Sequence, residues 1–298
     1  MAKIIAMMNQ KGGVGKTTSS VNLAACLAVA EKRTLLIDLD PQGNGSLSIG
    51  LPKEKFAAKN IYHALIGQID LKEAIYESEL PFFHICPSDN NLSGAEIELV
   101  SLFARESKLK NAFKSVDKDY DYIIIDCPPS LGLLTVNALN AAHSYIVPMQ
   151  TEYLAMEGLA QLLNTVRLIR TSLNPNLELD GILLTMYDSR SGLHKQVATE
   201  IKTHFGDTVF KTIIPRNVKL AECPSFGKPI ILYDIESKGS EAYLALAKEI
   251  ILKERFKANA EAAPKDSGSD KEPEDLLMSS IPDLSTINAA DEPPIFEQ

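Results

Sequence analysis

Short apolar runs alternate with segments in which apolar residues recur every three or four positions, as far as about residue 256. Some runs are continuously apolar, such as Ile123-Ile124-Ile125, which is typical of strands buried on both faces of a sheet. The strand-length runs are residues 3–8, 34–39, 82–86, 122–126, 145–149, 181–186 and 208–214. The helical patterns are residues 17–30, 94–116, 131–142, 158–173, 194–205 and 240–256.

Regular alternation of strands and helices predicts an α/β fold. Each strand–helix–strand unit crosses over with a right-handed connection, which builds a doubly wound, mostly parallel sheet with helices on both faces. Ligands of such sheets bind outside the carboxyl ends of the strands. We therefore expect residues 1–256 to form one domain whose chemistry lies in the loops that follow the strands.

The composition changes at residue 257. Residues 257–298 contain three Lys against ten Asp or Glu, so this tail carries −7 of the chain's net charge of −9 and the rest is nearly balanced. Five prolines and few apolar residues predict a disordered, acidic tail, because too little apolar surface is available to offset the entropy of ordering. Two apolar spots interrupt it, Leu276-Leu277-Met278 and Ile295-Phe296, which are incidental or a docking motif.

Several classes of protein are disfavoured by composition. No run approaches the ~18 apolar residues of a membrane span, and the N-terminus lacks the pattern of a signal peptide, so we expect a cytoplasmic protein. The four cysteines, Cys26, Cys86, Cys127 and Cys223, are widely separated and form no C-x-x-C pair. They predict neither a zinc site nor a redox dithiol.

Residues 11–18 read Lys-Gly-Gly-Val-Gly-Lys-Thr-Thr and stand between the first strand and the first helix. Glycines let backbone N–H groups converge on an anion, and the helix N-terminus adds unpaired donors. This context predicts a P-loop for a nucleotide, in which Lys16 reaches the terminal phosphates and the Thr17 hydroxyl ligates Mg²⁺. The ordinary pattern has a glycine at position 10, which is Gln10 here, and Lys11 is an additional lysine. The predicted nucleotide contacts are Lys11, Gly12, Gly13, Val14, Gly15, Lys16, Thr17 and Thr18.

Carboxylates stand at the ends of two apolar strands. The second strand runs into Asp38-Leu39-Asp40, and the fourth ends at Asp126. Buried carboxylates are costly unless they are paired or near a metal, and phosphoryl transfer needs such groups to hold Mg²⁺ and orient water. Asp126 fits a Walker-B role, although it could also cap a turn. Spacing does not decide between Asp38 and Asp40 for the catalytic position, since either could cap the following turn.

Four separated motifs together resemble the ParA/Soj family of partition ATPases, which carry a deviant Walker A loop. They are the loop with Lys11, Leu-Ile-Asp-Leu-Asp-Pro-Gln-Gly-Asn at 36–44, Ile-Ile-Ile-Asp-Cys-Pro-Pro-Ser at 123–130 and Ile-Pro-Arg-Asn-Val-Lys-Leu at 214–220. The resemblance covers residues 1–255. It implies that the protein segregates chromosomes or plasmids and hydrolyses ATP.

What the family resemblance implies for the site is an ATP-dependent homodimer with the nucleotide enclosed between two subunits. Lys11 would reach phosphates of the other subunit, and Gly12 would lie where the two backbones approach. Lys16 would be catalytic together with Lys11 and Asp40, and Asp40 would position the hydrolytic water. Thr17, Asp40 and Asp126 would form the Mg²⁺ site. Pro215, Arg216 and Asn217 would lie near the adenine.

The same resemblance implies partners. The dimer would bind duplex DNA without sequence preference, which would make it nucleoid-associated, and a ParB-like centromere-binding protein would stimulate hydrolysis. The positions that match the DNA-binding residues are Arg190 and Lys219, with Lys195 and Arg216 as neighbours. Each of these could instead be an ordinary solvated surface charge.

Four other functions compete with this one. A MinD-like ATPase would bind membranes through a basic amphipathic helix, whereas this chain ends in an acidic stretch that an anionic bilayer repels, so we expect no membrane partner. An orphan relative would position another cargo. A relative of the nitrogenase iron protein needs cysteine ligands in a context that Cys86 and Cys127 lack. A scaffold without turnover is disfavoured because Thr17, Asp40 and Asp126 are all present.

Overall fold

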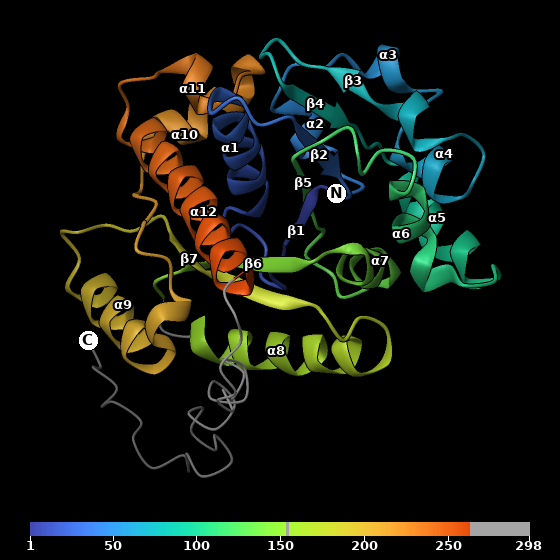
Figure 1. Ribbon diagram of the computed structural model, residues 1–298. Helices are drawn as coiled ribbons and strands as arrows, with labels where there is room; N and C mark the ends of the chain where they lie inside the picture. Colours follow the sequence, from blue (N-terminus) through green and yellow to red (C-terminus); the bar gives the residue numbers. More distant parts are fainter. Residues whose placement is uncertain (153–154, 263–298) are drawn as a thin grey trace, which may run out of the picture.

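The computed structural model describes residues 1–152 and 155–262 of the chain (Figure 1). Within them, seven strands form a single sheet in the order β3-β4-β2-β5-β1-β6-β7. All neighbouring strands are parallel except β3, which runs antiparallel to β4 at the edge. The strands are β1 Lys3–Met7, β2 Thr34–Asp38, β3 Tyr76–Glu77, β4 Phe83–Cys86, β5 Tyr122–Asp126, β6 Ser144–Gln150 and β7 Glu178–Thr185. The mostly parallel α/β sheet is therefore confirmed.

Alternate residues of each central strand enter two separate cores. Ile4 and Ala6 of β1 pack into one core, and Ile5 and Met7 pack into the other. The first core is covered by α4 Ile61–Leu65, α5 Leu92–Val100, α6 Lys108–Phe113, α7 Leu133–Ala141, α8 Ala155–Ser172 and α9 Gly192–Phe205. The second core is covered by α1 Lys16–Val29, α10 Val218–Glu222, α11 Ile230–Tyr233 and α12 Lys238–Ala262. Helices thus cover both faces of the sheet, as Figure 1 shows.

The segment 208–214 is not a strand, and that prediction is wrong. It runs beside β7 and makes an isolated bridge from Val209 to Ile182, but no ladder follows. The reason is that the carboxylate of Glu249, on α12, takes the backbone N–H groups of Lys211 and Thr212 at 2.8 and 3.0 Å. An apolar pattern cannot show that a distant side chain will satisfy the backbone.

The helix expected over 94–116 is broken into two. Ala104 has a φ of 51° between α5 and α6, a left-handed conformation that interrupts the helix. Two asparagines of α7 hold the break: Asn137 accepts from Leu109 N at 3.1 Å and donates to Arg105 O, and Asn140 donates to Glu106 O. Between β2 and β3, α2 Asn44–Leu47 and α3 Lys53–Phe56 are short helices that the periodicity did not predict.

Helix α12 continues six residues beyond its expected end and reaches Ala262. Lys257 belongs to it and forms an ion pair with Glu178 of β7 at 2.6 Å. The predicted disordered tail otherwise falls in residues 263–298, which lie outside the described residues.

Candidate nucleotide-binding site

The P-loop is held by the ends of two other strands. Gly15 caps α1 with a φ of 86°, and a Cβ there would stand 3.7 Å from the Met186 side chain. The Thr185 hydroxyl, at the end of β7, donates to Val14 O at 2.8 Å. The Gln150 amide, at the end of β6, donates to Gly13 O at 3.2 Å. The loop backbone is therefore fixed at the carboxyl edge of the sheet.

Lys16 occupies the interior of this loop. Its side chain is buried, and its Nζ donates to the backbone O of Lys11 at 3.2 Å. Burial lowers the pKa of the Lys16 ammonium, and the nearby carboxylates of Asp126 and Asp40 oppose part of that shift. A buried ammonium inside a loop of converging N–H groups is a strong attractor for a phosphate.

Asp126 ends β5 directly beside the P-loop helix. Its Oδ1 accepts from the Ser20 hydroxyl at 2.9 Å, whereas its buried Oδ2 has no hydrogen-bond partner among the described residues. Burial raises the pKa of this carboxyl group, and the neighbouring Asp38 raises it further. A bound cation would give the Asp126 Oδ2 a partner and would lower the raised pKa of this carboxyl group. Thr17 lies close enough for its hydroxyl to lower the same pKa.

These residues fit a magnesium site of the phosphate-linked kind. The described part of the chain contains no cluster of three His, Cys, Asp or Glu that could hold a metal by itself. Mg²⁺ in nucleotide sites takes only one or two protein oxygens and completes its shell with phosphates and water. The orphaned Asp126 oxygen near Thr17 matches that pattern.

Asp38 and Asp40, which spacing could not tell apart, have different surroundings. Asp38 Oδ2 accepts from both the backbone N and the hydroxyl of Ser46 at 2.7 Å, so this side chain fixes the start of α2. Asp40 accepts only from Gln42 N at 2.9 Å, among residues of the described chain. The Asp38 carboxylate is therefore engaged with α2, whereas the Asp40 carboxylate accepts a single hydrogen bond among the described residues.

Lys11 does not point into the cradle that Lys16 fills. Its Nζ forms an ion pair with Glu152, just after β6, and both side chains are about half exposed. The Lys11 backbone N–H donates to Asn9 Oδ1 at 3.0 Å, which holds the front of the loop. The sequence did not predict the contact of Glu152 with Lys11. The sequence shows only that Glu152 is an acidic residue that follows a buried strand.

The segment predicted near the adenine lies close to the P-loop. Arg216 N donates to Tyr187 O at 2.9 Å, and Pro215 bridges the same residue, two positions after the Thr185 that anchors the loop. Asn217 caps α10 by accepting from Leu220 N at 3.3 Å. The fold therefore brings residues 215–217 to the edge of the candidate nucleotide site.

Comparison with known proteins decides the family. An "AAA domain" family model matches residues 2–179. The chain is 52% identical over 258 residues to chromosome partitioning protein ParA of Myxococcus xanthus, covering 87% of this chain and 91% of that protein. It is 55% identical over 250 residues to sporulation initiation inhibitor protein Soj of Bacillus subtilis, covering 84% and 98%. The chain belongs to the ParA/Soj family of chromosome-partitioning ATPases.

Solved structures support the same class of site. A cobyrinic acid a,c-diamide synthase from Mycobacterium smegmatis, crystallised with ADP and magnesium, resembles this structure with a TM-score of 0.76 and 35% identity. The match covers 90% of this chain and all of that one. This ParA/Soj chain is thus a P-loop ATPase by fold as well as by sequence.

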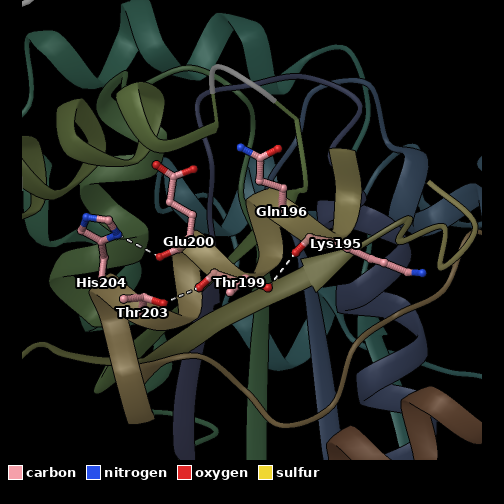
Figure 2. Close-up of a pocket in the computed structure, with 6 residues that line it drawn as sticks. All are labelled: Lys195, Gln196, Thr199, Glu200, Thr203 and His204. Carbon is pink, nitrogen blue, oxygen red and sulfur yellow. Dashed lines mark hydrogen bonds between the residues drawn. The ribbon is translucent and has the colours of Figure 1, made fainter. Parts of the chain in front are cut away.

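The four residues expected to bind DNA in this ParA/Soj chain differ in their ion pairing. Arg190 donates twice to the Asp188 carboxylate, at 3.0 and 2.8 Å, and Lys219 pairs with Glu222 at 3.1 Å. Lys195 starts the exposed face of α9, and Figure 2 shows it extending away from Glu200 and His204. Arg216 is exposed beside the nucleotide edge. Two of the four cations are therefore already paired with a neighbouring carboxylate.

The competing function that needs cysteine ligands can be compared with the structure. All four cysteines of this ParA/Soj chain are buried free thiols, so none presents a sulfur at the surface. Among the described helices, none is long and apolar enough to cross a membrane.

Proposed function

We propose that this partition ATPase works as an ATP-dependent homodimer that binds duplex DNA and is released when a partner stimulates hydrolysis. The observation that carries the proposal is the different placement of two lysines in one loop. Lys16 is buried in the cradle, whereas Lys11 is held at the surface by Glu152. A second lysine outside its own cradle is suited to a phosphate approached from another subunit.

The chain's own residues would divide the chemistry. Lys16 and the loop N–H groups bind and orient the β- and γ-phosphates. Thr17 and Asp126 offer the oxygens for Mg²⁺, which when bound neutralises charge on the phosphates. Asp40 has a free carboxylate oxygen with which to orient the attacking water, while Asp38 keeps the Asp40 loop in place. The names of the relatives and their bound nucleotides support this assignment.

Lys11 would couple the nucleotide to dimerisation. Two triphosphates facing each other across an interface would repel, and a lysine from each side offsets that charge. Reaching the other subunit requires Lys11 to leave Glu152. The exposed pair stabilises by only about 0.2–1 kcal/mol, so a phosphate can compete for the lysine.

DNA binding would follow from symmetry. Arg190, Lys195, Arg216 and Lys219 supply few phosphate contacts in one subunit, and a dimer doubles them. The carboxylates of Asp188 and Glu222 weaken two of these cations, which predicts modest affinity that falls steeply with salt. A ParB-like protein with a basic, flexible segment is the expected activator, because such a segment docked near the dimer seam could order the geometry around Asp40.

Asp40→Ala in the full chain tests the central claim. With hydrolysis slowed, Mg·ATP should convert the monomer to a dimer in sedimentation velocity, and Mg·ADP should not. A protein that remains monomeric with ATP at roughly tens of micromolar, a concentration typical of modest interfaces, contradicts the proposal. A basal turnover near ~10 s⁻¹, the median of enzymes, would contradict the need for an activator.

A further inference from the structure

A groove runs along the middle turns of α12, beside the segment that follows α9. It is enclosed by residues 206–211, which follow α9, and by residues 245–256 of α12, and its volume is about 860 Å³. Figure 1 shows α12 and the C-terminal end of α9 on the same side of the molecule. We call this surface the α12 groove. The proposed ATPase function assigns it no role.

The α12 groove carries uncompensated positive charge. Lys202, Lys211 and Lys248 are exposed at its sides, and none of them forms an ion pair with another residue of 1–152 or 155–262. The Glu249 carboxylate is already used by the backbone N–H groups of Lys211 and Thr212. Asp207 is the one exposed carboxylate among the described residues that line the groove. The groove therefore favours an acidic occupant.

The same groove also presents apolar surface. The side chains of Phe256 and Leu252 are 71% and 40% exposed at its mouth, and buried Val209 and Phe210 lie against its floor. Lys253 stands over the Phe210 ring at 5.6 Å and donates to Asp180 O, so its ammonium is already engaged. Acidic residues next to large apolar residues would match both features of this surface.

We propose that the α12 groove binds residues 274–278 of the same chain, Glu274-Asp275-Leu276-Leu277-Met278. This segment places two carboxylates directly before three large apolar side chains. The carboxylates complement the exposed lysines of the groove, and the apolar side chains complement its exposed apolar surface. Docking would pair Glu274 and Asp275 with the free lysines and cover Phe256 and Leu252 with Leu276 and Leu277.

The chain is long enough to make this contact within one molecule. Helix α12 ends at Ala262, and its own residue Phe256 lines the groove. The helix rises by 1.5 Å per residue, so the groove begins about 9 Å from that end. Eleven residues lie between Ala262 and Glu274 in the sequence, and a random coil of that length would have an r.m.s. span of about 18 Å. Tethering at this range gives an effective concentration on the order of millimolar, so a weak contact is sufficient.

The test uses the full chain with p-benzoylphenylalanine replacing Leu277. Irradiation should give a crosslink within one chain, and mass spectrometry should locate it among the residues that line the α12 groove. Raising the salt from ~50 to ~500 mM should lower the yield several-fold, because the ion pairs are exposed and screened. The Lys211→Glu and Lys248→Glu double variant should lower it by a similar factor.

Matched controls separate docking from general attraction. Lys110→Glu with Lys114→Glu makes the same charge change at exposed lysines on the opposite face of the sheet, and it should leave the yield unchanged. The photo-reactive residue placed at Ile287 or Phe296 should crosslink to the groove several-fold less. Crosslinks from position 277 that fall elsewhere, that join two chains, or that ignore the lysine reversals would each overturn the proposal.

Discussion

Asp38 and Asp126 are register partners at the carboxyl ends of adjacent strands β2 and β5, yet their carboxylates have different hydrogen-bond partners. Both side chains are fully buried; burial raises the pKa of both carboxyl groups, and Asp38 raises the pKa of Asp126 further. Ser46 satisfies the Asp38 carboxylate from two donors, whereas one Asp126 oxygen stays without a partner among the described residues. Asp126 is thus the member of the pair that is suited to bind a cation.

The buried Asp pair should make the nucleotide-free protein less stable as the pH rises. Unfolded Asp has a pKa near ~3.9, and the folded pKa of both groups is raised, so the folded state holds the extra protons. The stabilisation that comes from these protonated carboxyl groups is complete below about pH 4, and it is lost as the pH rises through their raised folded pKa. Asp126→Asn should therefore flatten the fall in melting temperature between weakly acidic and slightly alkaline pH.

The size of that effect can be bounded by linkage. Each unit of raised pKa corresponds to ~1.4 kcal/mol, and we expect a difference of at least that size at slightly alkaline pH. Asp188→Asn is the control, because its carboxyl group has a lowered pKa caused by Arg190 and lies at the surface. A variant whose pH profile parallels the wild type would show that Asp126 is not the source.

Replacing Lys16 with alanine should strongly weaken nucleotide binding. The change removes the buried ammonium of the cradle, and charged hydrogen bonds of this kind contribute about 1.5–3 kcal/mol each, so affinity should fall on the order of a hundredfold. Isothermal titration with Mg·ATP measures it. Lys11→Ala is the matched control: it should bind within a few-fold of the wild type but lose ATP-dependent dimerisation.

Glu152→Gln should strengthen the ATP-dependent dimer. In the wild type, dimerisation breaks the Lys11–Glu152 ion pair in each subunit, which costs about 0.2–1 kcal/mol per subunit. The variant has no such pair to break, so the monomer–dimer Kd should fall by about 2- to 30-fold. Sedimentation in the Asp40→Ala background gives this constant. Glu73→Gln breaks a comparable exposed pair with Lys59 and should change nothing. An unchanged Kd for Glu152→Gln would mean that the pair does not oppose dimerisation.

Neutralising two carboxylates should tighten DNA binding. Asp188→Asn frees Arg190, and Glu222→Gln frees Lys219, so each variant adds an unpaired cation at a proposed phosphate contact. We expect a several-fold gain at low salt with ATP, and a corresponding loss for Arg190→Glu and Lys219→Glu, in a mobility-shift assay with duplexes of unrelated sequence. Asp119→Asn, which frees Lys72 elsewhere, is the charge-matched control. Equal DNA retention by all variants would exclude these residues.

Gly227→Ala should destabilise the fold through a contact between two backbones. Gly227 has a φ of 62°, and an added Cβ would stand 2.5 Å from the Cα of Gly50. The left-handed conformation costs about 1–2 kcal/mol, and the clash with backbone adds to it. Gly67→Ala measures the cost of the left-handed conformation alone, because Gly67 has a φ of 81° and nothing lies within 4 Å of the added Cβ. In urea unfolding, Gly227→Ala should lose clearly more stability than Gly67→Ala.

The sequence pattern was sufficient where a segment's structure depends on its own residues. Continuous apolar runs such as Ile123-Ile124-Ile125 identified the buried strands, and the glycines before Lys16 identified the phosphate loop. It failed where a distant side chain decides. Glu249 takes the N–H groups that would have made 208–214 a strand, and Asn137 holds the break in the helix expected over 94–116.

The candidate site divides in the same way. Spacing placed Asp38 and Asp40 at a strand end but could not tell them apart. They differ because Ser46, eight residues after Asp38, donates hydrogen bonds to Asp38, and the sequence pattern does not predict that contact. The pairing of Lys11 with Glu152 joins residues 141 positions apart and leaves no local signal. The roles of Lys11, Asp40 and the basic residues stay predictions.

The position of β1 has a consequence for synthesis of the chain. This strand is made first and leads directly into the P-loop, but in the sheet it lies between β5 and β6, which end at Asp126 and Gln150. At about 5–20 residues per second, a ribosome needs on the order of ten seconds to supply those neighbours. Until then the phosphate loop lacks the neighbouring strands that hold it in the folded protein. A nascent chain interrupted before residue 150 should therefore be unable to hold ATP, and its apolar first strand would need protection by chaperones.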